Sequence, residues 1–435
     1  MTTARTATPS TARAINDRLA LDLLLERGPL TASDLRTLTG LSRPTVADLL
    51  ERLQRSGLVA QAGESAALRR GPNARLYGLV SDRAHLAGID IRATGVSLVV
   101  ADLTGRTLGT ATIAASARSE AEGSGRPPTA VDGAAGTAGA AADVSAPTRA
   151  GTAVSAEGGP GDGDLLVERT VEALLATAAA AGAQDLHTVA VGAPGLVDPV
   201  SGALNNSGKL PEWHTKLLAA LRARRGTEVI LENEVNLAGI AEHRIGAAQD
   251  RKDFALIWLG HGVGASVVLD GRLRRGASGG TGEIGFLPVP GTGGLPDATR
   301  CDGGFHSLVS SAAICELGAR HGLDAEPDGS EPGAEAVVRL AVRTGARDFL
   351  EELAGRIAVG ASSICVVLDP GCVVLGGEIG QAGGPELAAR VERQLARLSP
   401  LATEVRAGTA GGGAVLAGAV LTAGDAVRRE LFGGE

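Results

Sequence analysis

Five polar side chains between residues 42 and 70 have the types and positions that suit contacts to a DNA duplex. Ser42, Arg43 and Thr45 lie at the start of a segment whose apolar residues recur at helical spacing. Side chains on the first turn of such a helix reach base edges in the major groove, and a serine that caps the helix can approach a phosphate. Arg69 and Arg70 lie in a polar turn, where they suit backbone phosphates or the minor groove. The alternative for any single arginine is a solvated surface charge.

The elements that must position these side chains follow from the apolar spacing and from the capping residues. Three helices are predicted, over residues 12–27, between the caps Thr31 and Gly40, and over 43–56, and two strands follow, over 58–60 and 75–80. This order within 80 residues is typical of a winged helix-turn-helix, whose third helix enters the major groove. The alternative is a winged helix that makes protein contacts instead.

Charge is distributed unevenly along the chain. The whole sequence has a formal net charge of −8, but residues 1–80 hold 11 arginines and 7 acidic residues, which gives +4 and leaves −12 on the remainder. A basic head on an acidic body is typical of a DNA-binding module joined to a part that does not bind nucleic acid. On charge alone, chance asymmetry is the alternative.

From residue 85 onward the pattern changes to that of a larger α/β domain. Strands are predicted over 87–91, 96–102, 107–114 and 188–193, with a helix over 165–181, and strands and helices alternate from there to residue 435. Residues 117–164 consist mainly of Ala, Gly, Ser, Thr and Pro, and we expect a disordered insertion because large apolar side chains are scarce. The uncharged stretch 407–424 is predicted to form a glycine loop and a buried helix rather than a membrane span. The chain thus divides into a domain over 1–80 and a domain over 85–435.

Six short motifs, most of them rich in glycine, are spread in order over the second domain. They are Ile89-Asp-Ile91, Gly192-Ala-Pro-Gly195, Leu231-Glu-Asn-Glu-Val-Asn-Leu-Ala238, Leu259-Gly-His-Gly-Val-Gly264, Gly276-Ala-Ser-Gly-Gly-Thr-Gly-Glu-Ile-Gly285 and Val373-Val-Leu-Gly-Gly377. Together they resemble the ROK family (repressors, open reading frames and sugar kinases). With a winged helix in front, the chain resembles its repressor branch, such as the xylose and N-acetylglucosamine repressors. The resemblance implies an α/β fold in which the winged helix-turn-helix precedes a two-lobed, actin/hexokinase-like domain.

The resemblance places a sugar site at Asn233 and Glu234. In the family's kinases an Asn-Asp pair at this position holds the sugar hydroxyls, and the Asp is the general base. Glu234 is one methylene longer, which in a site built for Asp displaces the carboxylate by about 1 Å and can cost ~100-fold in rate. Either carboxylate still accepts hydrogen bonds from a sugar, so Glu234 favours a binder over a catalyst. The alternative is a surface carboxylate on a strand-to-helix turn.

Glu283 and His306 complete the effector site that the resemblance implies. Glu283 lies where the family has a second sugar-binding carboxylate, among glycines that let the backbone approach a ligand closely. The alternative is that these glycines only form a turn. His306 falls where the family places another sugar-contacting Glu, in a region of loose alignment, and a solvated or core-edge histidine is the alternative.

Two motifs of the family's kinases are altered. Their Asp-x-Gly-Gly-Thr turn, whose backbone amides contact ATP phosphates, is replaced by Asp90-Ile-Arg-Ala-Thr94, so that Arg92 would clash with the nucleotide or substitute for its counter-charge. The zinc ligands are missing as well, because Phe286 stands in place of a His and residues 300–306 keep one cysteine of the motif. The resemblance therefore predicts no structural zinc, no cofactor and no catalytic residue.

The sequence predicts a sugar-responsive DNA-binding regulator of carbohydrate genes, with repression as the expected sign. Its predicted partners are a double-stranded DNA operator, a sugar or sugar-phosphate effector and further copies of itself in a homodimer or homotetramer, with no membrane. We expect a cytoplasmic protein with reduced thiols, because no secretory signal is found and the four cysteines show no CxxC pairing. The alternatives are an ATP-dependent sugar kinase with an extra domain and a regulator that has lost ligand binding.

Overall fold

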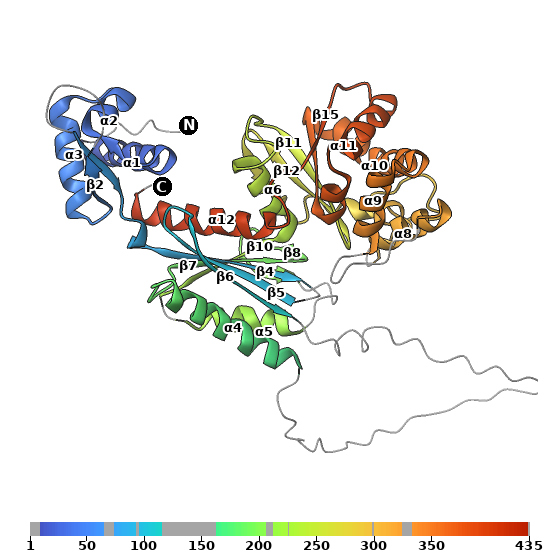
Figure 1. Cartoon of the computed structure of the whole chain (residues 1–435), viewed down its shortest axis with the longest axis horizontal. Helices are drawn as coiled ribbons and strands as arrows, with labels where there is room; N and C mark the ends of the chain where they lie inside the picture. The colour runs from blue at the N-terminus through green and yellow to red at the C-terminus, as the bar shows by residue number, and fades with distance from the viewer. Residues whose placement is uncertain are drawn as a thin grey trace, which may run out of the picture.

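A small N-terminal head precedes a larger body with two lobes (Figure 1). The structure is a computed structural model, and it describes residues 9–64, 74–92, 95–114, 162–205, 212–224, 226–297, 300–323 and 333–433. The insertion expected at about residues 117–164 lies outside these ranges except for its last three residues. These three form the first turn of a helix, so the expected disorder is wrong for residues 162–164. The composition of the segment does not indicate where this helix begins. In its first turn, Asp164 pairs with Lys216 of a neighbouring helix at 2.6 Å.

The head consists of three helices and a three-stranded sheet. They are α1 (Pro9–Arg27), β1 (Leu30–Thr31), α2 (Ala32–Thr39), α3 (Arg43–Arg55), β2 (Val59–Glu64) and β3 (Arg75–Leu79), with the strands in the order β1-β3-β2. The predicted caps of α2 are present, because Thr31 accepts a hydrogen bond from the backbone of Asp34 and Gly40 ends the helix at φ 71°. The predicted winged helix-turn-helix is confirmed, and β1 is a two-residue strand that the sequence does not predict.

A five-stranded sheet in the order β10-β7-β4-β5-β6 forms the first lobe. Strands β4 to β6 pair antiparallel, whereas β7 and β10 are added parallel to β4. Helices α4 and α5 cover one face and α12 covers the other (Figure 1). The elements are β4 (His85–Arg92), β5 (Gly95–Asp102), β6 (Thr107–Ala114), α4 (Asp162–Ala180), β7 (Thr188–Ala193), α5 (Glu212–Arg222), β10 (Glu228–Asn233), α12 (Ala414–Leu431) and the short hairpin β8 (Leu196–Val197) and β9 (Leu204–Asn205).

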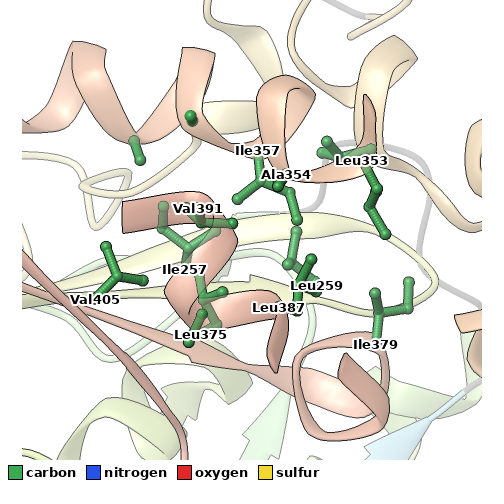
Figure 2. Packing of buried hydrophobic residues seen from close by; sticks show 14 of the residues in the cluster. Ile257, Leu259, Leu353, Ala354, Ile357, Leu375, Ile379, Leu387, Val391 and Val405 are labelled. Carbon is green, nitrogen blue, oxygen red and sulfur yellow. The ribbon is translucent and has the colours of Figure 1, made fainter. Parts of the chain in front are cut away.

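The second lobe is built on a five-stranded sheet in the order β13-β12-β11-β14-β15. Its core lies between this sheet and the helices α10 and α11, where Ile257, Leu375, Ile357 and Val391 pack together (Figure 2). The strands are β11 (Phe254–Leu259), β12 (Val263–Leu269), β13 (Arg272–Arg274), β14 (Cys372–Gly376) and β15 (Glu404–Ala407). Its helices are α6 (Glu234–Arg244), α7 (His306–Val309), α8 (Ser311–Arg320), α9 (Gly333–Thr344), α10 (Arg347–Leu368) and α11 (Gly377–Leu398), which is kinked at Gly384, together with the 3-10 turn η2 (Ile284–Phe286). A second 3-10 turn, η1 (Ser81–Arg83), lies between the head and β4.

Helices α6 and α12 pack against each other between the two sheets and connect the body with the head. Helix α6 also packs on β11 and β12, and α12 on β4 and β7. One continuous cluster of buried apolar side chains runs from Leu49 in the head through Leu86 on β4 to Val427 and Phe432 at the end of α12. The predicted buried helix within 407–424 is therefore confirmed. Among the described residues, no helix has the length and apolar character needed to cross a membrane.

Candidate functional site

The first turn of α3 places the predicted DNA-contacting residues at the surface of the head. Ser42 caps the helix: its Oγ accepts a hydrogen bond from the backbone nitrogen of Thr45 at 3.4 Å and lies 2.8 Å from the hydroxyl of that residue. Arg43 is exposed on this turn. Pro44 has no backbone N–H and that of Thr45 is used by Ser42, so it is the positive end of the helix dipole that adds to the charge of Arg43. This end of α3 therefore suits a phosphate or another anion.

Two acidic residues farther along the exposed face of α3 are neutralised within the helix. Asp48 pairs with Arg52, which also pairs with Asp17 of α1 at 2.6 Å, and Glu51 pairs with Arg55 at 2.7 Å. Because these charges cancel, the uncompensated positive charge of α3 lies at its N-terminal end. Strands β2 and β3 form the wing, and its tip, which includes Arg69 and Arg70, lies outside the described residues. The DNA contacts of these two arginines stay predictions.

Asn233 and Glu234 lie where β10 ends and α6 begins, at the boundary between the lobes. The side-chain oxygen of Asn233 accepts hydrogen bonds from the backbone nitrogens of Val235 and Asn236 and thereby caps α6. Its amide nitrogen donates to the backbone oxygen of Gly195 at 3.2 Å and to Glu234 at 3.0 Å. These four bonds use the whole hydrogen-bonding capacity of the amide. In this state Asn233 positions Glu234, and its direct contact to a sugar stays a prediction.

Glu234 is a half-buried carboxyl in an acidic neighbourhood. Its burial raises its pKa to about 7, and the negative charges of Asp90 and Glu283 act in the same direction, whereas Arg92 opposes them. Asp90, Glu283 and Arg92 thus each act electrostatically on Glu234, and Asp90 and Arg92 also pair with each other at 2.7 Å. A carboxyl with such a pKa is partly protonated at neutral pH, so it can both donate to and accept from a hydroxyl group.

Glu283 is exposed on a glycine-rich turn that packs against two strands. A side chain at Gly279 would lie 1.9 Å from the backbone oxygen of Val197, and one at Gly282 would lie 1.9 Å from that of Ala265. Both glycines also have positive φ angles, of 79° and 94°. The close packing of the turn on β8 and β12 therefore explains these glycines without a ligand.

His306 is half-buried at the first position of α7 and lies next to the turn that carries Glu283. A side chain at Gly285 would begin 3.6 Å from the Cβ of His306. The structure thus brings together Glu234, Glu283 and the neighbourhood of His306, which come from separate segments of the chain. Whether these side chains contact a sugar stays a prediction.

An ion-pair triad that joins the two lobes lies beside Glu234, and the sequence predicts only part of it. Arg92, the last residue of β4, has its Nε 2.7 Å from the Asp90 carboxylate and a terminal nitrogen 2.6 Å from the Glu378 carboxylate. Asp90 is 3% exposed, and this burial raises its pKa, against the attraction of Arg92. The geometry agrees with the prediction that Arg92 serves as a counter-charge. The negative charges that it compensates belong to the carboxylates of Asp90 and Glu378.

Glu378 is the functional candidate that the sequence analysis misses. It is the second residue of α11, after Gly376 and Gly377, and its carboxylate rests so close to Gly260 that a side chain there would lie 2.5 Å from it. The Arg92–Glu378 contact joins residues 286 positions apart, so no local pattern announces it. The only signal is the Gly376-Gly377 motif, which marks the start of a helix at the cleft.

Two cavities of the described structure are lined by other residues. One, of about 520 Å³, lies between the head and the body, where α1 faces α6 and α12. The other, of about 560 Å³, lies beside the β8–β9 hairpin and reaches Glu232, one residue before Asn233. Glu232 is buried and pairs with Arg275 at 2.6 Å. The candidate site at Glu234 rests on its side-chain contacts and charges, and neither cavity contains it.

Residues 164–425 match the model of the ROK family, and residues 15–71 match that of the MarR family. The first match covers more than half of the chain. The chain belongs to the ROK family. Its described architecture is a MarR-type winged helix followed by a ROK domain of two lobes.

ROK relatives of both kinds, enzymes and regulators, are similar to this chain. A glucokinase of Halalkalibacterium halodurans is 26% identical over 216 residues, which cover 46% of this chain and 63% of the relative. The DNA-binding transcriptional dual regulator NagC of Escherichia coli K12 is 33% identical over 138 residues, 32% of this chain and 33% of the relative. The chain thus aligns with less than two thirds of the length of these curated relatives.

Solved ROK structures share the fold. A ROK family transcriptional regulator described as a homologue of the E. coli MLC protein superposes with a TM-score of 0.68 at 18% identity, over 97% of this chain and all of that one. A ROK family glucokinase from Streptomyces griseus, in complex with glucose and AMPPNP, superposes with a TM-score of 0.56 at 24% identity over 78% of this chain. At these identities the likeness concerns the fold, and the match to the regulator includes the head.

For the zinc site whose absence the sequence predicts, the described residues offer few candidate ligands. Within the described ranges, no group of three or more His, Cys, Asp or Glu side chains is arranged to hold a metal ion. All four cysteines are free, and Cys301 and His306 are both half-buried. The absence of a structural zinc stays a prediction of the sequence.

The raised pKa of Glu234 in this ROK cleft predicts a pH-dependent stability. Its folded-state pKa of about 7 lies above its usual 4.5, so the native state binds more protons than the unfolded state between these pH values. The stability that this group contributes is complete below about pH 4.5 and is lost as pH rises through 7. Glu234→Gln removes this loss, and we expect the variant to gain about 2 kcal/mol relative to wild type between pH 4.5 and pH 8, after a discount for partial exposure.

Urea unfolding of both proteins at the two pH values measures this difference. Glu168→Gln, an exposed glutamate on α4, is the matched control, and its difference from wild type is expected to stay constant with pH. A constant difference for Glu234→Gln as well would mean that the carboxyl titrates normally.

Proposed function

We propose that this protein is a sugar-responsive, DNA-binding transcriptional regulator of carbohydrate genes, acting as a repressor. The observation that carries the proposal is the exposed N-terminal turn of α3, with Arg43 at the positive end of the helix, in a winged helix that is fused to a ROK body. The similarity to NagC and the superposition on a ROK regulator over 97% of the chain support it. Operator DNA is the partner of the head, and a sugar is the effector of the body.

The effector site in this proposal is the cleft between the lobes. The sugar hydroxyls contact Glu234 and Glu283, with Asn233 and His306 at the edge of the site. A sugar that contacts both lobes favours one degree of closure between them. Because α6 begins at Glu234 and packs on α12, which shares an apolar cluster with the head, closure changes the placement of the winged helix.

DNA recognition in this proposal requires two heads. In a homodimer or homotetramer, paired half-sites about one DNA turn apart, or a multiple of that, fit only one spacing of the heads. A change of lobe closure therefore alters operator affinity. Coupling free energies of this kind typically change an affinity ~5–150-fold.

The experiment that tests the proposal is selection of genomic fragments by the purified full chain, followed by titration of the selected fragment with and without a panel of sugars. We expect a fragment beside carbohydrate genes and at least one sugar that changes its affinity. A protein that ignores duplex DNA even at low ionic strength would overturn the proposal.

A second candidate, an ATP-dependent sugar kinase, is favoured by one observation. The pKa of Glu234 near 7 is the value that suits a general base at neutral pH. Against it, Arg92, which stands in the segment where the resemblance places the ATP phosphates, is paired with Glu378 at 2.6 Å. A coupled assay with ATP and common hexoses separates the two candidates, because a kinase is expected to turn over at ~1 per second or faster.

A further inference from the structure

The candidate effector cleft contains an excess of negative charge. Its ion-pair triad consists of the carboxylates of Asp90 and Glu378 and one cation, Arg92, and the carboxyl of Glu234 lies within the electrostatic influence of Asp90 and Arg92. Nearby Arg275 does not reduce this excess, because the buried Glu232 neutralises it at 2.6 Å. Even with Glu234 protonated, the cleft therefore carries a net negative charge.

Arg92 is not available to an incoming anion. Its guanidinium is shared between Asp90 at 2.7 Å and Glu378 at 2.6 Å, so two carboxylates already compensate one positive charge. A ligand phosphate would have to displace one of them and leave it beside the others. Asp90 cannot move into solvent at low cost, because it is 3% exposed on β4.

Glu378 occupies the position beside Arg92 that would otherwise attract an anion. It is the second residue of α11, whose first helical segment ends at the non-helical residue Gly384, and its carboxylate lies 2.6 Å from Arg92, the cation of the ion-pair triad. Its carboxylate rests against Gly260, at the end of β11, and so covers the bare backbone of that turn. The protein thus supplies its own anion to the end of the cleft at which a phosphate group would otherwise bind.

Taking the effector cleft of the proposed function as given, we infer that its ligand is an unphosphorylated sugar, and that Glu378, held by Arg92, excludes sugar phosphates and nucleotides. Hydroxyl groups of an uncharged sugar can donate to the carboxylates without adding charge. A phosphate ester brings about two further negative charges into a net negative site, where each unfavourable pair at short range weakens binding by about tenfold or more.

Isothermal titration of the purified full chain with matched pairs tests this inference. The probes are glucose, N-acetylglucosamine and xylose, with glucose 6-phosphate and N-acetylglucosamine 6-phosphate as the charged partners. We expect at least one free sugar to bind, and its phosphate ester, where the pair exists, to bind at least about tenfold more weakly. Tighter binding of the ester would overturn the inference and leave the proposed function standing. If no probe binds and no probe changes the affinity of the protein for DNA, both the inference and the proposed response to sugar would be overturned.

The variant Glu378→Gln tests whether Glu378 is the residue that selects against phosphate esters. The substitution keeps the size of the side chain but frees Arg92 and removes one negative charge from the helix N-terminus. We expect the ratio of ester to free-sugar affinity to rise by about tenfold. Glu386→Gln is the matched control, because Glu386 lies on the same helix, is exposed and pairs with Arg390. An unchanged ratio in a folded Glu378→Gln protein would show that Glu378 does not select against phosphate.

Discussion

Replacing Arg43 by Glu is expected to lower the affinity of the protein for its selected DNA fragment by about 100-fold or more. One good base or phosphate contact of an arginine is worth about 1–3 kcal/mol, and the reversed charge adds repulsion from the DNA backbone. Arg43 lies at the end of α3 where the helix dipole also favours an anion. A glutamate there opposes both contributions. Titration of labelled duplex at several salt concentrations measures the loss.

Arg55→Glu is the matched control for this prediction. Arg55 lies on the same helix and is exposed, but it lies at the opposite end and pairs with Glu51. The same change of charge at this position is expected to alter DNA affinity by less than about fivefold through long-range effects, which salt screens. Equal losses for the two variants would mean that net charge, and not the N-terminal turn of α3, determines binding. Thermal unfolding is expected to stay within about 2 °C of wild type for both variants, since both sites are exposed.

The head could be predicted almost completely from the sequence because its signals are local. Thr31 and Gly40 bound α2, Ser42 caps α3, and the apolar positions of α3 include Val46 and Leu49, which are buried. Each of these signals acts over four residues or fewer. The two-residue strand β1 is missed because its pairing with β3 depends on contacts across the folded head.

The candidate cleft could be predicted only in part. The positions of Asn233, Glu234 and Glu283 follow from motifs. The hydrogen bonds of Asn233 and the pKa of Glu234 do not. That Asn233 uses all its hydrogen bonds within the protein depends on Gly195, 38 residues away, and the high pKa of Glu234 depends on its burial first and then on the charges of Asp90 and Glu283. The role of Glu378 requires the approach of α11 to β4. Such properties arise from segments that only the tertiary fold brings together.

Replacing Glu242 by Ala is expected to lower the free energy of unfolding by about 4 kcal/mol, and the melting temperature by roughly 10 °C. Glu242 lies on α6 and is 3% exposed. Its carboxylate accepts hydrogen bonds from the backbone nitrogens of Ala247 at 2.7 Å, Thr409 at 3.1 Å and Ala410 at 2.9 Å. The alanine variant leaves these donors in a closely packed site without an acceptor, and each one costs about 1–3 kcal/mol. Glu168→Ala on the surface of α4 is the control, with an expected change below about 0.5 kcal/mol.

The position of Glu242 gives this variant a second expected effect, on signal transmission. The carboxylate ties α6, which begins at the effector cleft, to the loop that leads into α12, and α12 shares its apolar cluster with the head. Without this tie only the packing of α6 on α12 couples the two helices, so closure of the lobes moves α12 less. We therefore expect Glu242→Ala, at a temperature where it is folded, to keep DNA and sugar binding within about threefold of wild type but to lose most of the sugar-dependent change in DNA affinity. A variant that is destabilised as expected yet responds fully to sugar would show that the signal reaches the head by another route, through β4 and the connection at residues 80–84.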